Sequence, residues 1–380
     1  MRLSPAAQNR PKSGVRKMME LAWGRPDVVH LEVGEPGFNT PQHVLDAVRD
    51  AAASGQTKYA PTPGLPALRE ALAEKVRRAN GINAQPRQVL VTSGGANALF
   101  AVIGTLLGPN DSMLLPNPGW SNFTMMTRAF GARTVYYDLD ASNGYLPKVE
   151  QLNSLVDEST RALLINTPSN PLGSVIDRAL AERLMAFATS RDLWIIADEC
   201  YDGIDFSGRF FSIGSLEPQP ERVISVYSFS KVYAMTGWRV GYAVLPERVV
   251  DPVLGLLQPS VMCSNTPAQY GALAAITGPQ DYLDAWREFY LANRDFVLDA
   301  IRGSRFSAMR PDGGFYIWLD VTRFGLPCDD VAYRLLEEAN VAMTPGTAFG
   351  TNGEGYLRLS LATTRDRLEL GLSRMLAWRP

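Results

Sequence analysis

A lysine flanked by hydroxyl groups is the residue of this chain best suited to covalent chemistry. Lys231 closely follows an apolar run that ends at Tyr227. A lysine amine that is desolvated, or that lies beside another cation, has a lowered pKa and becomes a nucleophile. Arg239 lies eight residues further on and, together with Ser228, would bind a dianionic phosphate.

An acid stands at the end of another apolar run. Asp198 directly follows residues 194–197, and Tyr201 comes three residues later. A carboxylate at the end of a buried strand is costly unless it has a partner, so we expect Asp198 to face a cation. The alternative is an ordinary solvated acid at a strand end.

Two loops complete the set of polar strand ends. Residues 93–97 (Ser-Gly-Gly-Ala-Asn) leave a strand and open a helix, an arrangement that favours an anion. Asn170 follows Pro168 and directly precedes Pro171, which would fix the direction of its amide. Taken alone, each loop also fits a plain turn.

These candidates require a sheet whose strands end at a common edge. Seven short apolar runs alternate with helical stretches such as 177–190, where Asp177 would cap the helix. Runs that are apolar throughout indicate strands covered on both faces, so we predict an α/β fold with a mostly parallel central sheet. The expected strands are 89–92, 112–115, 134–137, 162–166, 193–198, 222–227 and 240–245.

The pattern changes after about residue 260. A long apolar stripe over 281–301 predicts a helix that joins two domains. Beyond it, strands and helices mix, as in a smaller α+β domain; the expected elements are 315–319, 329–338, 356–360 and 365–376. We therefore predict a large domain over 40–265 and a small domain made of 1–39 and 266–380.

Composition excludes several classes of function. The 380 residues are 46% hydrophobic and carry a net charge of −2, which gives no reason to expect nucleic acid or an anionic membrane as partner. Neither a signal peptide nor an apolar run of membrane length is apparent. The three cysteines are scattered, so we expect a cytoplasmic setting. With only His30 and His43, we expect no metal and no Ser-His-Asp triad.

Together, the four strand ends call for one small aromatic partner. It would carry a phosphate, a carbonyl that condenses with Lys231, and a ring nitrogen that pairs with Asp198. Pyridoxal phosphate has these features.

At this point the chain resembles the class I/II aminotransferases, fold-type I pyridoxal-phosphate enzymes, and within them the bacterial aspartate aminotransferase branch. The resemblance spans nearly the whole chain. Its segments, in order, are 33–41 (VGEPGFNTP), 58–64 (KYAPTPG), 117–120 (NPGW), 169–171 (SNP), 197–201 (ADECY), 228–241 (SFSKVYAMTGWRVG) and 356–360 (YLRLS).

The resemblance implies catalytic and cofactor roles. Lys231 would form the Schiff base with the cofactor and move the substrate proton, while Asp198 would keep the ring nitrogen protonated. The remaining cofactor contacts would be Asn170 and Tyr201 at the phenolate oxygen, Trp120 stacked on the ring, and Ser228, Arg239, Gly95 and Ala96 at the phosphate. Tyr59 would reach the phosphate from the other subunit of a homodimer whose active sites lie at the subunit interface.

It also implies substrate contacts and a reaction. Arg358 would clamp the substrate α-carboxylate, aided by the Gly34 backbone, next to Trp120 and Asn170. The expected activity is ping-pong transfer of an amino group from an L-amino acid to a 2-oxo acid, with an aspartate- or glutamate-like substrate as one option. A lyase, decarboxylase or synthase of the same fold, or a non-enzymatic sensor, stays open as an alternative.

Several positions bear on the substrate. Gly37, Gly119 and Ala96 depart from the family pattern, and Gly119 opens space near the ring. No second arginine for a side-chain carboxylate is evident, although Arg10, Lys12 and Arg16 are candidates. We expect Glu199, the neighbour of Asp198, to make only a solvent or loop contact.

Overall fold

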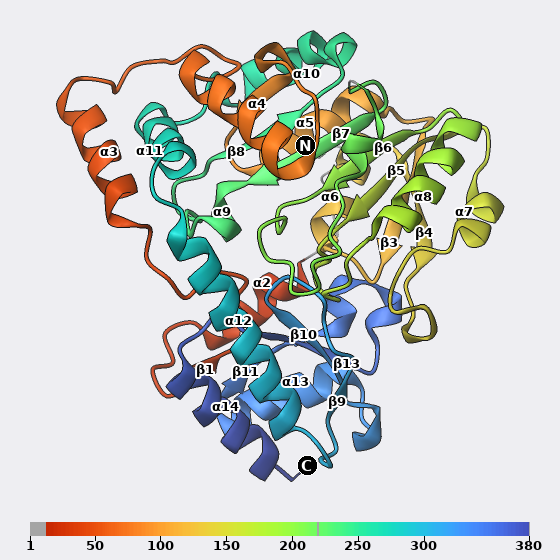
Figure 1. Ribbon diagram of the computed structural model, residues 1–380. Helices are drawn as coiled ribbons and strands as arrows, with labels where there is room; N and C mark the ends of the chain where they lie inside the picture. The colour runs from red at the N-terminus through yellow and green to blue at the C-terminus, as the bar shows by residue number, and fades with distance from the viewer. Residues whose placement is uncertain (1–12, 219, 380) are drawn as a thin grey trace, which may run out of the picture.

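The computed structural model describes residues 13–218 and 220–379, and its main feature is a seven-stranded sheet (Figure 1). The strand order is β2-β8-β7-β6-β5-β3-β4. The strands are β2 (Val89–Thr92), β3 (Ser112–Asn117), β4 (Arg133–Asp138), β5 (Thr160–Asn166), β6 (Trp194–Asp198), β7 (Val223–Ser228) and β8 (Gly241–Val244). All pairings from β7 to β4 are parallel, whereas β8 is antiparallel to β2 and β7. The predicted α/β fold with a mostly parallel sheet is confirmed.

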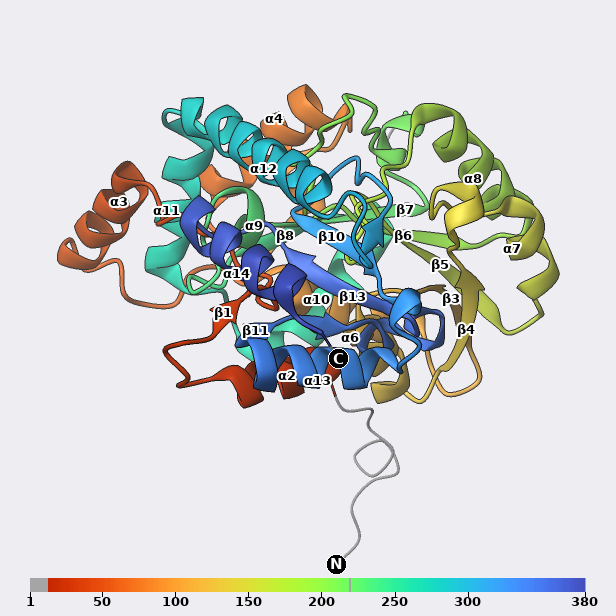
Figure 2. The same ribbon diagram turned by 90° about the horizontal axis from the view of Figure 1, so that it is seen from below.

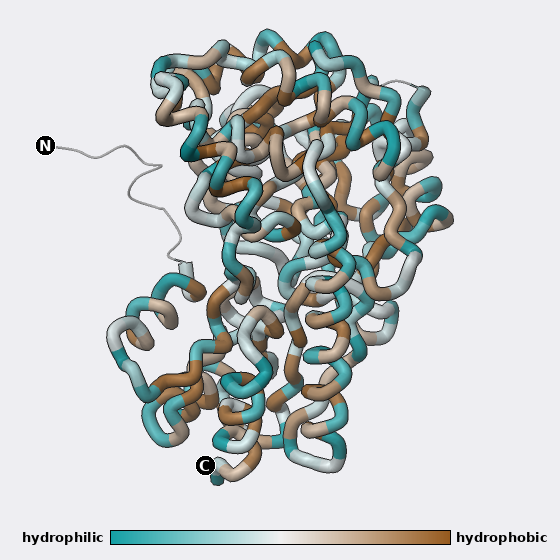
Figure 3. The backbone as a smooth tube through the Cα atoms, turned by 60° about the vertical axis from the view of Figure 1, so that its left-hand side comes forward, coloured by the Kyte–Doolittle hydropathy of each residue, from teal (hydrophilic) through white to brown (hydrophobic). Residues whose placement is uncertain are grey.

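Helices cover both faces of this sheet, which explains why its strands are apolar throughout. One hydrophobic cluster joins the sheet to α5 (Gly95–Leu106) and α10 (Glu247–Val261). A second cluster joins the opposite side to α8 (Arg178–Ser190). Figure 3 shows the hydrophobic stretches inside this part of the molecule and hydrophilic ones on its outer helices. The predicted strands differ from the observed ones by at most two residues at either end.

Shorter elements complete this part of the chain. The helices that flank the sheet are α3 (Gln42–Ala53), α4 (Pro66–Asn80), α6 (Ser121–Ala129), α7 (Val149–Leu155), α9 (Phe229–Val232) and α11 (Thr266–Thr277). The α9 helix is only one turn long and carries Lys231.

A second, mixed region lies beside the large sheet. It contains an antiparallel sheet ordered β12-β13-β10-β9 and a parallel pair, β1 with β11. Its strands are β1 (Val29–His30), β9 (Ser307–Ala308), β10 (Tyr316–Asp320), β11 (Val341–Ala342), β12 (Thr344–Pro345) and β13 (Tyr356–Ser360). Its helices are α2 (Gly14–Ala22), α13 (Cys328–Ala339) and α14 (Arg365–Ala377).

The helix α12 (Asp281–Ala300) runs from the large sheet to this mixed region, in teal in Figures 1 and 2. The domain limits at 39/40 and 265/266 remain a prediction. All seven strands of the large sheet fall within 40–265, but α11 packs against α3 and α4. That packing favours a boundary after α11.

The predicted cap of α8 supplies a test of the local fold. The Asp177 carboxylate accepts a hydrogen bond from the Leu180 N–H at 2.9 Å, so the predicted cap is confirmed. We expect Asp177→Ala to lower the free energy of unfolding by about 1 kcal/mol, because it leaves an N–H group of the first turn without its acceptor. Asp177→Asn keeps an acceptor and should stay near wild type in urea unfolding. A loss in Asp177→Ala below ~0.5 kcal/mol, as for ordinary surface changes, would contradict this role.

Candidate active site

A cavity of about 240 Å³ opens where the parallel strands end, at the edge predicted for the ligand. The strand order explains why the site residues lie close together, because the residues that follow β2, β5, β6 and β7 all reach the same edge of the sheet. The predicted site residues that line it are Gly34, Gly95, Ala96, Trp120, Asn170, Asp198, Tyr201, Ser228, Lys231, Arg239 and Arg358.

Tyr59 is the one predicted site residue that does not line this cavity. Its side chain is 85% exposed and lies in a separate surface hollow beside residues 263–267. Its expected contact was with the other subunit, so that role stays a prediction.

Lys231 reaches the cavity from the single turn of α9, directly after β7. Its ammonium donates a hydrogen bond to the Gly34 carbonyl oxygen, which belongs to the segment after β1. No carboxylate of the described residues lies within salt-bridge distance of it. The amine is therefore held in the cavity by a neutral carbonyl, a partner that it can leave.

Asp198 ends β6 and is nearly buried. Burial raises the pKa of its carboxyl, while hydrogen bonding from Cys200 and the charge of Lys231 act in the opposite direction. The Cys200 N–H donates to one carboxylate oxygen at 3.2 Å. A carboxylate held at such a depth is stabilised most by a cationic group placed opposite it in the cavity.

Glu199 corrects the sequence interpretation. We expected a solvent or loop contact, but its side chain is 0% exposed. Its carboxylate accepts hydrogen bonds from the Tyr227 hydroxyl at 2.7 Å and from the Ser212 hydroxyl at 2.7 and 2.9 Å. The expectation was wrong because β6 and β7 pair side by side, which brings Tyr227 close to Glu199; pairing of this kind is not readable from the local sequence.

The turn from β2 into α5 has the features of an anion-binding site. Gly94 has φ +83°, a conformation that favours glycine, and a Cβ there would lie 2.4 Å from Arg239 Nη2. The Arg239 guanidinium is held by the Thr236 carbonyl at 2.9 Å and reaches the Ser230 hydroxyl at 3.4 Å. The first N–H groups of a helix lack intrahelical acceptors, so the start of α5 at Gly95 adds donors beside this cation.

Arg358 enters from β13, in the mixed region, and is 2% exposed. Its Nη1 donates to Asn170 Oδ1 at 3.0 Å and its Nη2 to the Glu32 carbonyl at 2.7 Å. Its Cζ lies 4.2 Å from the centroid of the Tyr316 ring. The buried Nε has no partner among the described residues. Arg358 lines the cavity, and a guanidinium has five N–H donors, more than its two hydrogen bonds use.

Gly34 allows the backbone after β1 to lie close to Tyr316 and Arg358. A Cβ at Gly34 would lie 2.4 Å from the Tyr316 hydroxyl and 3.9 Å from Arg358 Nη2. The Tyr316 hydroxyl in turn lies 3.1 Å from that of Tyr201, whose pKa is raised by burial. The large-sheet region and the mixed region thus contact each other closely through Gly34, Tyr201, Tyr316 and Arg358.

Sequence reasoning missed several residues that line the cavity, of which Tyr316 is the most important. It lies on β10, whose antiparallel pairing with β13 sets it opposite Ser360, two residues from Arg358. No polar flank or spacing marks it, and only the pairing of these strands could have found it. Further lining residues that were not predicted are Val15, Leu99, Asn166, Cys200 and Ser230.

Two of the N-terminal cations that were candidates for a substrate contact, Arg10 and Lys12, lie outside the described residues. The third, Arg16, pairs with Glu20 at 2.8 Å on the exposed side of α2. None of the described helices is long and apolar enough to cross a membrane.

Comparisons with known proteins agree on one family. The model for aminotransferase class I and II matches residues 26–375. The chain is 37% identical over 361 residues to an aspartate/prephenate aminotransferase of Thermus thermophilus, covering 94% of this chain and 92% of that protein. It is 34% identical over 379 residues to aromatic-amino-acid aminotransferase 2 of Thermococcus litoralis, covering 99% and 97%.

Solved structures give the same result. The structure of an aspartate aminotransferase from Thermus thermophilus with maleate superimposes with a TM-score of 0.94 at 37% identity, covering 99% of both chains. A protein described as an aromatic aminotransferase from Pyrococcus horikoshii superimposes with a TM-score of 0.89 at 33% identity, covering 95% of this chain and 97% of that one.

The buried Glu199 predicts a pH dependence of stability. Burial raises its pKa from 4.5 to about 7. Between these values the folded state keeps a proton that the unfolded state has lost, so stability falls as pH rises through this window. Relative to Glu199→Gln, we expect wild type to lose on the order of 3 kcal/mol across the window. Urea unfolding at several pH values measures this, with the exposed Glu150→Gln as control; parallel curves for wild type and Glu199→Gln would contradict it.

Proposed function

The chain belongs to the class I and II aminotransferases and is a transaminase, and we propose that it uses pyridoxal phosphate held at Lys231. The observation that carries this proposal is the joint lining of one cavity by Lys231, Asp198, Arg239 and Arg358. An amine, an acid and two guanidinium groups are the partners that a carbonyl, a ring nitrogen, a phosphate and a substrate carboxylate require.

Three features of the cavity fit this cofactor. Asp198 is a buried carboxylate in need of a cation, which a protonated ring nitrogen supplies. The glycine turn before α5 leaves no room for a Cβ beside Arg239, as a phosphate cradle requires. Arg358 lines the cavity with a guanidinium fixed by Asn170 and the Glu32 carbonyl, and it keeps further N–H donors for a carboxylate.

We assign the remaining contacts by the same chemistry. Pyridoxal phosphate supplies a carbonyl that condenses with amines and a ring that withdraws electrons from the substrate Cα. Ser228, Arg239 and the N–H groups of Gly95 and Ala96 would hold its phosphate. Asn170 and Tyr201 would donate to its phenolate oxygen, and Trp120 would stack on its ring.

The protein's own part in the reaction is positioning and proton transfer. Arg358 would bind the substrate α-carboxylate through two N–H groups, with Gly34 alongside, and so orient the Cα–H bond. Lys231 Nζ would take the proton from the substrate Cα. It would then deliver this proton to the cofactor carbon that is to carry the amino group. Asp198 would keep a proton on the ring nitrogen throughout.

The walls of the cavity bear on the substrate side chain. Lys231, Arg239 and Arg358 already have partners in this scheme, and Val15, Ala96 and Leu99 add apolar surface. Relatives are named for aspartate, prephenate and aromatic amino acids. Among the described residues the lining favours uncharged side chains, so we propose aromatic and aliphatic L-amino acids as donors ahead of aspartate and glutamate.

We further propose a cytoplasmic homodimer with Tyr59 of each chain at the other's phosphate cradle. The exposed Tyr59 lies beside residues 263–266, near the exposed Val261 and Met262, which together offer an apolar surface to a second copy. The three cysteines are free thiols, as is usual in a reducing compartment.

Absorption spectra test the proposal directly. The protein with pyridoxal phosphate should show the band of a protonated lysine Schiff base, which single L-amino acids bleach and a 2-oxo acid restores. Lys231→Ala should lose the band, and Lys148→Ala, an exposed lysine paired with Asp140, should keep it. A full band in Lys231→Ala would overturn the assignment of the lysine. Release of ammonia or carbon dioxide instead of a new amino acid would favour a lyase or a decarboxylase.

The arginine clamp gives a second test. Arg358→Lys keeps the charge but loses the planar pair of donors. We expect KM for the amino donor to rise about 10- to 100-fold, with a smaller change in kcat, because binding of the carboxylate is what weakens. The matched control is Arg183→Lys, at a surface arginine of α8 that pairs with Glu150. Equal KM values in the two variants would show that the carboxylate binds elsewhere.

A further inference from the structure

A second cavity adjoins the active-site cavity. It encloses about 300 Å³, at the lower end of the ~300–1,000 Å³ typical of small-molecule sites. Trp120 lines both cavities. Phe349 lines the second, and its ring centroid lies 4.9 Å from Arg358 Cζ. The two cavities therefore share walls, and we refer to the second one as the rear groove.

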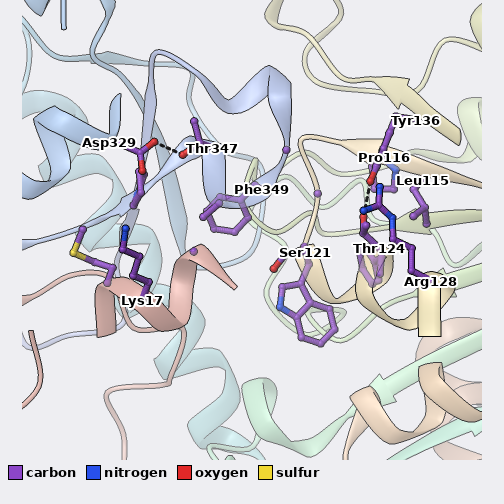
Figure 4. Close-up of a pocket in the computed structure, with 18 of the residues that line it drawn as sticks. Lys17, Leu115, Pro116, Ser121, Thr124, Arg128, Tyr136, Asp329, Thr347 and Phe349 are labelled. Carbon is purple, nitrogen blue, oxygen red and sulfur yellow. Dashed lines mark hydrogen bonds between the residues drawn. The ribbon is translucent and has the colours of Figure 1, made fainter. Parts of the chain in front are cut away.

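Two helices from different regions form the sides of the rear groove. Ser121, Thr124 and Arg128 follow a spacing of three and four residues, which puts them on one face of α6. Across from them, Lys17 lies on α2. In Figure 4 the α6 residues lie on one side of the groove, and Lys17 lies with Asp329 on the other.

The floor of the rear groove is apolar and aromatic. Phe123 packs edge-on against Trp120, with ring centroids 5.4 Å apart. Leu115, Pro116 and Phe349 extend this floor. Gly119 also lines the groove. A Cβ at this position would lie only 2.6 Å from the Pro116 carbonyl oxygen, and the glycine adds no side chain that would fill the groove. Flat apolar groups suit such a floor.

The rim carries positive charge. Arg128 is exposed and has no carboxylate within salt-bridge distance among the described residues, and the remaining positions (1–12, 219 and 380) hold no Asp or Glu. Lys17 faces the acid Asp329 and lies 5.0 Å from the centroid of the Tyr333 ring, so the net positive charge of the rim comes from Arg128.

A hydrogen-bonding group completes the lining. The Ser121 hydroxyl is buried and has no partner among the described residues. Thr124, by contrast, is satisfied by the Tyr136 hydroxyl at 3.0 Å. A buried polar group without a partner is costly and is stabilised by a ligand that bonds to it.

We propose that the rear groove is a second binding site, for a small aromatic carboxylate. The ring would lie on Trp120 and Phe349, and the carboxylate would face Arg128. An inorganic anion would leave the aromatic floor unused, and an uncharged apolar ligand would leave Arg128 without a partner. The site differs from the amino-acid position at Lys231 and does not depend on the proposed reaction.

Calorimetry with 3-phenylpropanoate tests the site, because this probe has neither an amino nor an oxo group and cannot be transaminated. The titration uses cofactor-loaded Arg358→Leu, in which the carboxylate clamp of the active site is gone. Wild type with excess maleate, a dicarboxylate added to compete for that clamp, provides the same measurement without the substitution. We expect one bound probe per chain in both preparations.

Variants then locate the bound probe. In the same background, Arg128→Gln should weaken binding about 3- to 10-fold, the effect of one exposed charge pair. Arg191→Gln, a surface arginine that bonds Asn153 instead, should have no effect. Propanoate, which lacks the ring, should bind at least about tenfold more weakly than the probe. Loss of all binding when the clamp is removed or filled, or binding unchanged in Arg128→Gln, would overturn the proposal.

Discussion

The main constraint on this fold is that charged side chains are buried at one edge of the large sheet, where the dielectric constant is low. Each buried charge needs a partner, and the fold has to supply it. Asp198 is only 5% exposed, and its ionised form is stabilised by an N–H donor and by the charge of Lys231. Burial without such partners would cost several kilocalories per mole. The parallel strands supply the geometry, because they deliver these residues to one edge and leave a cavity between them.

A single region could not have completed the site. The large sheet provides Lys231, Asp198 and the turn beside Arg239, but Arg358, the arginine that we propose for the substrate carboxylate, comes from β13 in the mixed region. The guanidinium of Arg358 bonds both Asn170, from the large-sheet side, and the Glu32 carbonyl, from the segment after β1. In the proposed function, substrate binding would therefore depend on how the two regions are held together, with Tyr316 and Gly34 where they meet.

Local sequence was sufficient to predict some of the fold and of the site, but not all of either. The strands of the large sheet, the Asp177 cap and the residues at the strand ends follow from periodicity and turn chemistry, since those signals involve neighbours in the chain. The resemblance supplied Arg358 and Gly34. The burial of Glu199 and the position of Tyr316 could not be predicted, because each depends on which strands pair. Side-by-side pairing of β6 with β7 and of β10 with β13 is a property of the tertiary fold.

The hydrogen bond from Lys231 to the Gly34 carbonyl connects residues 197 positions apart. As an ammonium group, Lys231 ties the segment after β1 to α9. In the proposed role as a nucleophile, the same amine would have to release that segment. Any compound that reacts with Lys231 competes with the protein's own backbone for the same nitrogen. If a cofactor binds covalently at Lys231, as proposed, its binding free energy would be linked to the free energy that holds the two regions in contact.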